Sequence, residues 1–150
     1  MDIYDPAQLE AHIRKIMAFY HPRCIDPNGG FFHYLRDDGR IDDHYHRHLV
    51  SSTRYVVVYA RYAEYFDEPE YLHWVRHGLA YLEKRHFQTR HQGYAWALQD
   101  GEVEDDTNHC YGLAFVMLAY ATALRAGIAE AREGPVSYTH LRAHETRGNL

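Results

Sequence analysis

The densest group of chemically active side chains is the stretch HYHRH at residues 44–48, in a chain of 150 residues that contains 13 histidines. Imidazole is a good ligand for transition metals, and alternate positions on a β-strand share one face. His48, however, falls in the first turn of an expected helix, which breaks the alternation, and no cysteine or carboxylate stands at a recognised metal-ligand spacing. We therefore expect these histidines to form hydrogen bonds or to pack, and we expect no metal site.

Two pairs of adjacent aspartates offer a second kind of chemistry. Asp42-Asp43 and Asp105-Asp106 could supply the acid and base of a glycoside hydrolase, which needs two carboxyl groups about 5–10 Å apart. Each pair also stands just before an expected helix, where carboxylates cap free N–H groups and face the positive end of the helix dipole. We favour capping and keep hydrolysis as the alternative.

Arg54 is the most informative single residue. It lies one to two turns into an otherwise apolar helix, with Val50, Val57 and Val58 around it. An unpaired charge inside a protein is very costly, so a guanidinium buried there needs a partner. An aspartate could be that partner; alternatively, the forked donors point into a pocket and bind substrate oxygens. We favour the second interpretation, in which Arg54 binds substrate.

The elements that must position these residues occur twice in the sequence. Residues 29–54 and 92–115 share a glycine-led aromatic run, an acidic DG turn, an Asp-Asp pair and a helix that begins at histidine. Within this alignment Asp43 corresponds to Asp105, and His48 corresponds to His109. Such self-similarity is typical of a repeat architecture in which one supersecondary unit is copied and stacked.

Four helices and two hairpins make up the two units. Asp5-Pro6 is expected to begin the first helix, because aspartate caps and proline fits the first helical position. The second runs from about residue 47 to 66, and the third, capped by Asp67, from there to about 86. The fourth, capped by Asp106 or Thr107, covers about 108–126. DG turns at residues 36–39 and 100–101 predict two short β-hairpins.

The distribution of apolar residues sorts these helices into two layers. The third helix is amphipathic and should lie outside, whereas the fourth is apolar nearly all round and should be buried on most sides. The second, apolar apart from Arg54 and Arg61, takes an inner position. An outer helix, a hairpin and an inner helix then form one unit, and the fold class is all-α, the start of an α/α toroid.

Composition excludes several classes of partner. The net charge of −5 argues against nucleic acid, since no Lys/Arg stripe is available for the phosphate backbone. The N-terminal residues contain no apolar leader, no long apolar span occurs, and two cysteines fit a reducing cytosol. We therefore expect a cytoplasmic protein without a membrane partner. The 14 tyrosines and 13 histidines suit a carbohydrate pocket, although they also suit a tyrosine-rich core.

Three segments together resemble the N-acylglucosamine 2-epimerase family, which includes mannose isomerases and cellobiose 2-epimerases. They are GGFFHYLRDDG, RHLVSSTRYVVVYARY and GYAWALQDGEVEDDTNHCYGLAFVMLAYATALRAG, and they cover most of residues 29–127. The resemblance implies an (α/α)6 barrel of helical hairpins with short β-hairpin loops, of which residues 1–134 form the N-terminal part of the catalytic domain. Six such units would need roughly 370 residues.

The resemblance also implies an activity. In this family a histidine pair removes and returns the C2 proton of a free reducing sugar through an enediolate, without a cofactor, and imidazole suits such chemistry near neutral pH. Those histidines belong to later repeats, so we expect no catalytic residue in this chain and no activity from it alone. Arg54 matches the family arginine that contacts sugar oxygens, and Tyr111 matches a tyrosine that lines the pocket. The full-length protein could form a homodimer.

Two other functions remain open at this point. One is an (α/α)6 glycoside hydrolase that uses an aspartate pair, and the other is a helical-repeat interaction module in which Arg54 pairs internally. Residues 135–150 are interpreted separately. From Val136 to Thr146 they resemble the translation of a transposase sequencing adapter, and they show no helical period after Gly134. We interpret them as a non-native, disordered tail.

Overall fold

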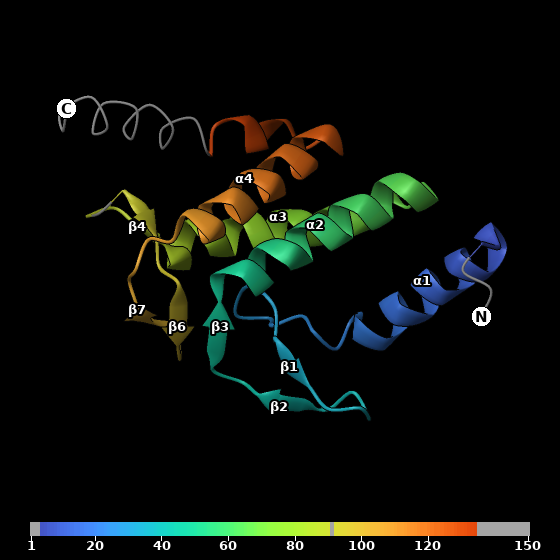
Figure 1. Cartoon of the computed structure of the whole chain (residues 1–150), viewed down its shortest axis with the longest axis horizontal. Helices are drawn as coiled ribbons and strands as arrows, with labels where there is room; N and C mark the ends of the chain where they lie inside the picture. The colour runs from blue at the N-terminus through green and yellow to red at the C-terminus, as the bar shows by residue number, and fades with distance from the viewer. Residues whose placement is uncertain (1–3, 91, 135–150) are drawn as a thin grey trace.

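The computed structural model describes residues 4–90 and 92–134, so the interpretation of residues 135–150 as a tail lies outside the described residues. Within this part, a long helix, a group of short strands and a second long helix follow one another twice (Figure 1). The α-helices are α1 Pro6–Tyr20, α2 Leu49–Phe66, α3 Leu72–Tyr81 and α4 Cys110–Arg125. Short helical turns flank the last two, at Pro69–Tyr71, Leu82–His86 and Ala129–Arg132.

Helix α1 begins and ends as predicted. The Asp5 carboxylate accepts a hydrogen bond from the Ala7 backbone N–H at 3.0 Å, Pro6 opens the helix, and Tyr20 is its last residue before His21-Pro22. Of the apolar residues on its inward stripe, only Met17 is buried, while the other four remain 36–46% exposed. These four are Leu9, Ile13, Ile16 and Tyr20.

Both predicted hairpins are present, and one of them joins the two units. Strand β1 (Tyr34–Leu35) pairs with β2 (Ile41–Asp43), and β6 (Ala97–Gln99) pairs with β7 (Glu102–Asp105). Asp100 and Gly101 have φ of 52° and 79°, as the tight turn between β6 and β7 requires. Strand β3 (His46–His48) adds to β6, so a strand of the first unit continues the hairpin of the second. A further pair joins β4 (Phe87–Gln88) to β5 (Gly93–Tyr94).

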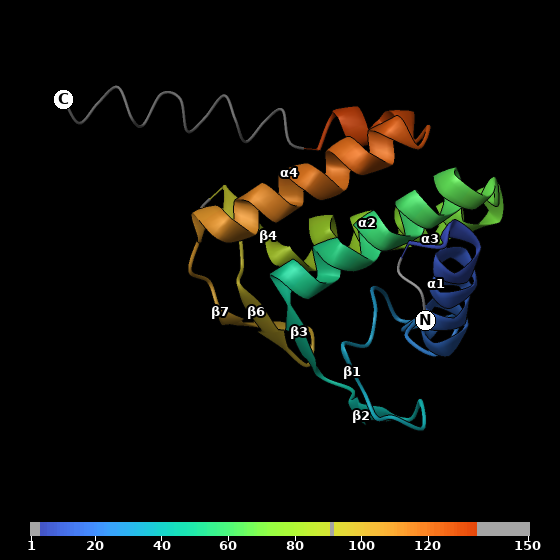
Figure 2. The ribbon, with the colours of Figure 1, turned by 45° about the vertical axis from the view of Figure 1, so that its right-hand side comes forward.

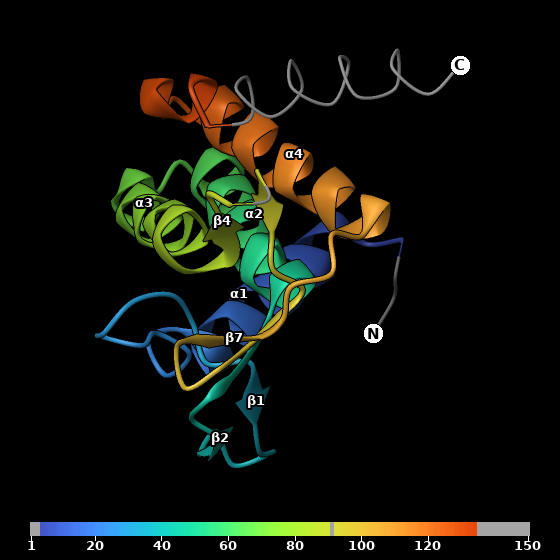
Figure 3. The same cartoon turned by 90° about the vertical axis from the view of Figure 1, so that its left-hand side faces the viewer.

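Helix α2 forms the centre of the packing. It contacts both α3 and α4, runs parallel to α4, and carries the fully buried residues Val56, Tyr59 and Ala60 (Figures 1 and 2). Gly78 allows α3 to approach, because a Cβ there would lie 2.6 Å from Val56 Cγ2. The strands lie at the N-terminal ends of α2 and α4, and the β1–β2 hairpin projects beyond the helices (Figure 3).

The prediction that α4 is buried on most sides is wrong. Val116 and Tyr120 are buried, but Met117, Leu118 and Leu124 are 51%, 48% and 37% exposed. The helix is apolar nearly all round, and the described residues that cover it belong mainly to α2, α3 and the short helix Ala129–Arg132. In the part of the chain that the structure describes, no helix is both long and apolar enough to cross a bilayer.

The predicted helix caps are also corrected. Asp67 follows the last residue of α2 and caps its C-terminus in the left-handed conformation, with φ of 54°, and does not cap α3. Asp43 accepts hydrogen bonds from the backbone N–H groups of Tyr45 and His46, and Asp105 accepts one from that of Thr107. The aspartates thus stabilise the turns that lead into β3 and α4. Helix α2 starts at residue 49 and α4 at 110, about two residues later than expected.

Candidate functional site

Arg54 lies in the second turn of α2 and is exposed. Its guanidinium carbon stands 4.9 Å from the centroid of the Phe115 ring, which belongs to α4. It forms no ion pair with any residue that the structure describes. The apolar neighbours of Arg54 in the sequence predict that its charge lies inside the protein; the structure places it in contact with solvent, where it needs no carboxylate partner.

The arginine that is buried with an aspartate partner is Arg47. Its side chain is 3% exposed, and its Nη2 lies 2.9 Å from the carboxylate of Asp26. The same nitrogen donates to the His44 carbonyl oxygen, and the Phe32 ring lies 4.8 Å from the guanidinium carbon. The requirement for an internal partner therefore applies to Arg47 on β3, and Arg54 remains available for a ligand.

Tyr111, the other predicted substrate-binding residue, lies in the first turn of α4 and is 57% exposed. Its ring meets the Phe115 ring edge-on at a centroid distance of 5.0 Å. Phe115 thus contacts both predicted binding residues, Arg54 on α2 and Tyr111 on α4. Sequence analysis did not identify Phe115, because only the packing of α2 against α4 gives it this position.

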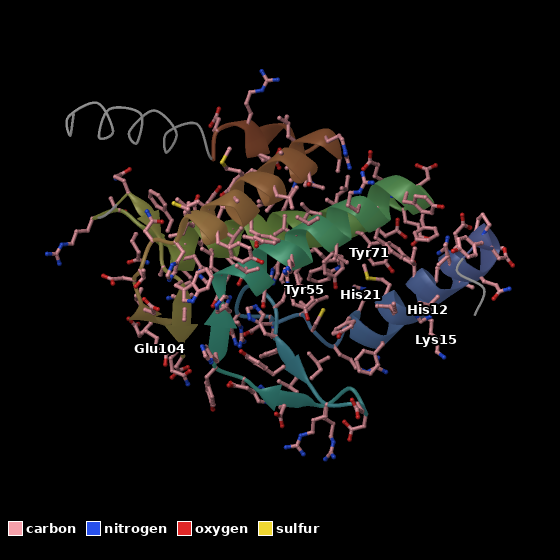
Figure 4. All side chains as sticks on the ribbon, in the orientation of Figure 1. His12, Lys15, His21, Tyr55, Tyr71 and Glu104 are labelled. Atoms are coloured by element: carbon pink, nitrogen blue, oxygen red, sulfur yellow. The ribbon has the colours of Figure 1, made fainter. Side chains whose placement is uncertain are left out.

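A groove of about 470 Å³ lies between α1 and α2, and Arg54 is one of its lining residues. Its other polar lining groups include His33 and Ser51, and apolar side chains of both helices cover most of the rest. Tyr55 and Tyr59 present ring surface to it. The Tyr55 hydroxyl donates to the Phe32 carbonyl oxygen, and that of Tyr59 is bonded to His21. Tyr55 on α2 and His21, just after α1, are labelled in Figure 4. The groove therefore combines flat apolar surface with one free guanidinium.

The histidines of residues 44–48 do not converge on a common point. His46 Nε2 on β3 lies 3.2 Å from the Glu104 carboxylate on β7, across the central strand β6, whereas the His44 ring packs edge-on against Phe32. Among residues 4–90 and 92–134, no three His, Cys, Asp or Glu side chains are grouped closely enough to hold a metal ion.

Trp96 stands between the N-terminal ends of α2 and α4. The rings of His48 and His109 meet it edge-on, at 4.3 and 4.4 Å. These two histidines occupy equivalent positions in the repeat and directly precede α2 and α4. The Trp96 carbonyl oxygen also accepts a hydrogen bond from the N–H of Leu49, the first residue of α2. No spacing in the sequence indicates this role, since Trp96 is distant from both His48 and Leu49 along the chain.

Asp43 and Asp105, one member of each aspartate pair, have the wrong electrostatics for a glycosidase acid. Backbone N–H groups of His46 and Tyr45 hold the pKa of Asp43 below its usual value, and hydrogen bonds from Thr107 lower the pKa of Asp105. A general acid requires a carboxyl group whose pKa is raised. Asp42, in turn, forms an exposed ion pair with Arg36 at 2.7 Å. The geometry therefore counts against the hydrolase alternative.

Comparison with known proteins gives a consistent set of relatives. Residues 30–146 match the sequence profile of the N-acylglucosamine 2-epimerase (GlcNAc 2-epimerase) family. A D-mannose isomerase from Marinomonas mediterranea is 51% identical over 137 residues, which cover 91% of this chain and 34% of that protein. A cellobiose 2-epimerase from Eubacterium cellulosolvens is 28% identical over 113 residues, which cover 75% of this chain and 28% of that protein.

Solved structures agree with these sequence matches. A crystal structure of a D-mannose isomerase superposes with a TM-score of 0.88 at 47% identity, covering 94% of this chain and 36% of that one. A cellobiose 2-epimerase from Bacillus thermoamylovorans superposes with a TM-score of 0.77 at 19% identity, covering 90% and 37%, and shows a shared fold. The chain spans about a third of the length of the relatives that it matches.

Proposed function

Because the chain belongs to the N-acylglucosamine 2-epimerase family, we propose that it is the N-terminal third of an enzyme that isomerises or 2-epimerises a free reducing sugar. The identity of 51% to a D-mannose isomerase is the observation that carries this proposal, and it makes mannose the first substrate to test over N-acylglucosamine. The complete enzyme would be an (α/α)6 toroid, with α2 and α4 as two of its inner helices.

The exposed arginine supports the proposal at the level of chemistry. Aldose–ketose isomerisation moves a proton from C2 to C1 of the sugar through an enediolate, whose oxygens carry negative charge as the proton leaves. Arg54 offers forked N–H donors that suit two neighbouring oxygens, and no described carboxylate competes for them. Tyr111, 57% exposed at the N-terminal end of α4, does not line the α1–α2 groove, but it contacts the Phe115 ring over which Arg54 lies and would line the sugar pocket of the complete enzyme.

The proton transfer itself is assigned to histidines outside this chain. We place the acid–base pair in the part of the relatives that the chain does not cover, so the present residues bind and orient the sugar. No cofactor is part of the proposed reaction. The proposed setting is the cytoplasm, with a small sugar as the ligand and a homodimer as the assembly of the full-length protein.

Isotope exchange tests the proposal directly. The full-length enzyme is incubated with D-mannose in D₂O, and fructose formation and deuterium incorporation are followed by NMR. Fructose that carries solvent deuterium at C1 is the expected result, because the catalytic base exchanges the proton that it takes from C2 with solvent before it returns one to C1. Epimerisation of cellobiose without ketose release would place the protein in the epimerase branch. No reaction with any free sugar would contradict the proposal and would favour a non-enzymatic interaction module.

A further inference from the structure

A continuous series of buried and partly buried hydrogen bonds passes through Ser52 on α2. The His48 backbone N–H donates to His33 Nδ1 at 3.0 Å, and His33 Nε2 lies 3.4 Å from Ser52 Oγ. Ser52 Oγ also lies 3.0 Å from His86 Nε2, and His86 Nδ1 lies 3.0 Å from the Ala95 carbonyl oxygen. His86 is fully buried and Ser52 is 4% exposed.

The two ends of this series determine the position of every proton in it. A backbone N–H can only donate, so His33 Nδ1 carries no proton, and the proton of the neutral ring sits on Nε2. A carbonyl oxygen can only accept, so His86 carries its proton on Nδ1. His33 therefore donates to Ser52, and the Ser52 hydroxyl donates to His86. Burial lowers the pKa of His33 to about 3 and that of His86 to about 4, which keeps both rings neutral.

This series of hydrogen bonds connects the two repeat units at the first turn of α2. His33 precedes β1 in the first unit, whereas His86 and Ala95 belong to the second. The Ala95 N–H donates back to the His86 carbonyl oxygen at 2.7 Å, and the next residue, Trp96, accepts from the N–H of Leu49. The start of α2 is thus held by side-chain and backbone bonds from both units.

We propose that Ser52 is a positioning residue, which fixes the rotation of α2 about its axis and thereby the direction of Arg54. Two residues that are two positions apart in an α-helix are separated by about 200° of rotation about the helix axis, so their side chains lie on opposite sides of the helix. With Ser52 held against His33 and His86 on the buried side, Arg54 is directed to the open side, over Phe115. The apolar packing of α2 stabilises the helix, but the directional bonds of Ser52 select one rotation. The effect of Ser52 on sugar binding rests on the proposed function, whereas its effect on the direction of the Arg54 side chain does not depend on that function.

The orientation of Arg54 can be measured without any activity. In the full-length protein, the ring current of Phe115 should change the NMR chemical shifts of the Arg54 side-chain N–H protons. These NMR signals are assigned by their loss in the Arg54→Lys variant. Ser52→Ala should move these signals toward the values of a free arginine. Thr53→Val is the matched control: it removes the neighbouring hydroxyl, whose bond to the Val50 carbonyl oxygen stays within α2. Unchanged Arg54 signals in Ser52→Ala, or an equal change in Thr53→Val, would overturn the inference.

Kinetics then connect this orientation to the sugar. Loss of one neutral hydrogen-bond network should raise KM for mannose about two- to tenfold in Ser52→Ala, with a smaller change in kcat. The increase should vanish in an Arg54→Lys background if Ser52 acts through Arg54, and a KM effect that persists there would overturn that link. A wild-type enzyme that binds and converts no sugar, but whose Arg54 signals move in Ser52→Ala, would contradict the proposed function and support the positioning role.

Discussion

Arg54 lies over the ring of Phe115, with its guanidinium carbon 4.9 Å from the ring centroid, and this contact joins α2 to α4. The Tyr111 ring meets the same phenylalanine at 5.0 Å. One apolar side chain thus holds two polar ones next to each other at the N-terminal ends of parallel helices. A cation–π contact at an exposed site contributes only about 0.5–1 kcal/mol, so its main effect is to orient the donors of Arg54.

Substitution of Arg54 by lysine should separate binding from folding. In the full-length enzyme, Arg54→Lys keeps the charge but loses the planar fork, so kcat/KM should fall at least tenfold. The melting temperature should stay within about 2 °C of the wild type, because the side chain is exposed and pairs with no described carboxylate. Steady-state kinetics and thermal unfolding of the same preparation test both statements. Unchanged turnover with a large loss of thermal stability would instead make Arg54 a structural residue.

Phe115→Leu tests the orienting role of the ring. Leucine keeps an apolar side chain on α4 but removes the aromatic face, so KM should rise about two- to fivefold, in line with the strength of one exposed cation–π contact. Val103→Leu, on the exposed strand β7, is the control for a conservative apolar change and should leave KM unaltered. If Phe115→Leu and the control gave the same KM, the contact between Phe115 and Arg54 would not contribute to sugar binding.

Local signals account for the parts of the fold that the sequence predicts well. The Asp5-Pro6 cap and the DG turns depend on residues within a few positions of each other, and α1 and both hairpins form where these signals stand. The aspartates before α2 and α4 were assigned to the wrong N–H groups. Asp43 and Asp105 reach the nearest free donors, which belong to the preceding turns.

The candidate site depends on contacts that local patterns do not contain. An apolar helix with two arginines suggested that Arg54 was buried, but α2 turns Arg54 outward, while Arg47 on β3 is enclosed beside Asp26. Likewise, His33 and His86 are two of 13 histidines, and only the pairing of two units across Ser52 makes them distinctive. The repeat can be predicted from the sequence, because residues 29–54 and 92–115 share the same pattern.

Gly78→Ala should destabilise the protein although alanine is the better helix former. Alanine gains about 1 kcal/mol of helix propensity over glycine, but its Cβ would stand 2.6 Å from Val56 Cγ2 and 2.9 Å from Phe31 Cε2. Overpacking of this kind costs about 1–3 kcal/mol, so the net free energy of unfolding should fall. His73→Ala, at an exposed position of the same helix, should change it by less than about 0.5 kcal/mol. A stabilised Gly78→Ala protein would show that α3 moves away from α2 at little cost.

Stability should decrease as the pH falls below about 6.5. An unfolded histidine takes up a proton near pH 6.5, whereas burial lowers the pKa of His33 to about 3 and that of His86 to about 4 in the folded protein. Between these values the unfolded state binds more protons. Each of the two residues should then remove about 1.4 kcal/mol of stability for every pH unit from about 6.5 down to about 4.

The surroundings of the two rings support this direction, and one variant isolates it. His33 faces Arg47, whose positive charge lowers the pKa of His33 further than burial alone. The Tyr55 ring stacks on the His33 ring. His86 faces His48 and Tyr81. The further charged or titratable neighbours of His33 are His46, His48 and His86. Urea unfolding at several pH values should give a pH slope smaller by about 1.4 kcal/mol per unit in His86→Gln than in the wild type. Equal slopes would show that His86 is protonated in the folded protein.

The 150-residue chain, made alone, should associate in solution and should not isomerise sugars. Residues on α1 and α4 that a longer chain would cover are exposed here, among them Ile16 at 46%, Met117 at 51% and Leu118 at 48%. Contiguous apolar surface beyond a few hundred Å² favours association, and stacked repeats depend on their neighbours for stability. Size exclusion should therefore give species larger than a monomer, and the double variant Met117→Lys/Leu118→Glu should shift them toward the monomer. Mannose and fructose should not interconvert, because the proton transfer is proposed to depend on histidines outside this chain, and Arg54 and Tyr111 are proposed only to bind the sugar. A monodisperse wild-type monomer with cooperative unfolding would contradict the first expectation, and measurable isomerisation would contradict the assignment of proton transfer to residues outside this chain.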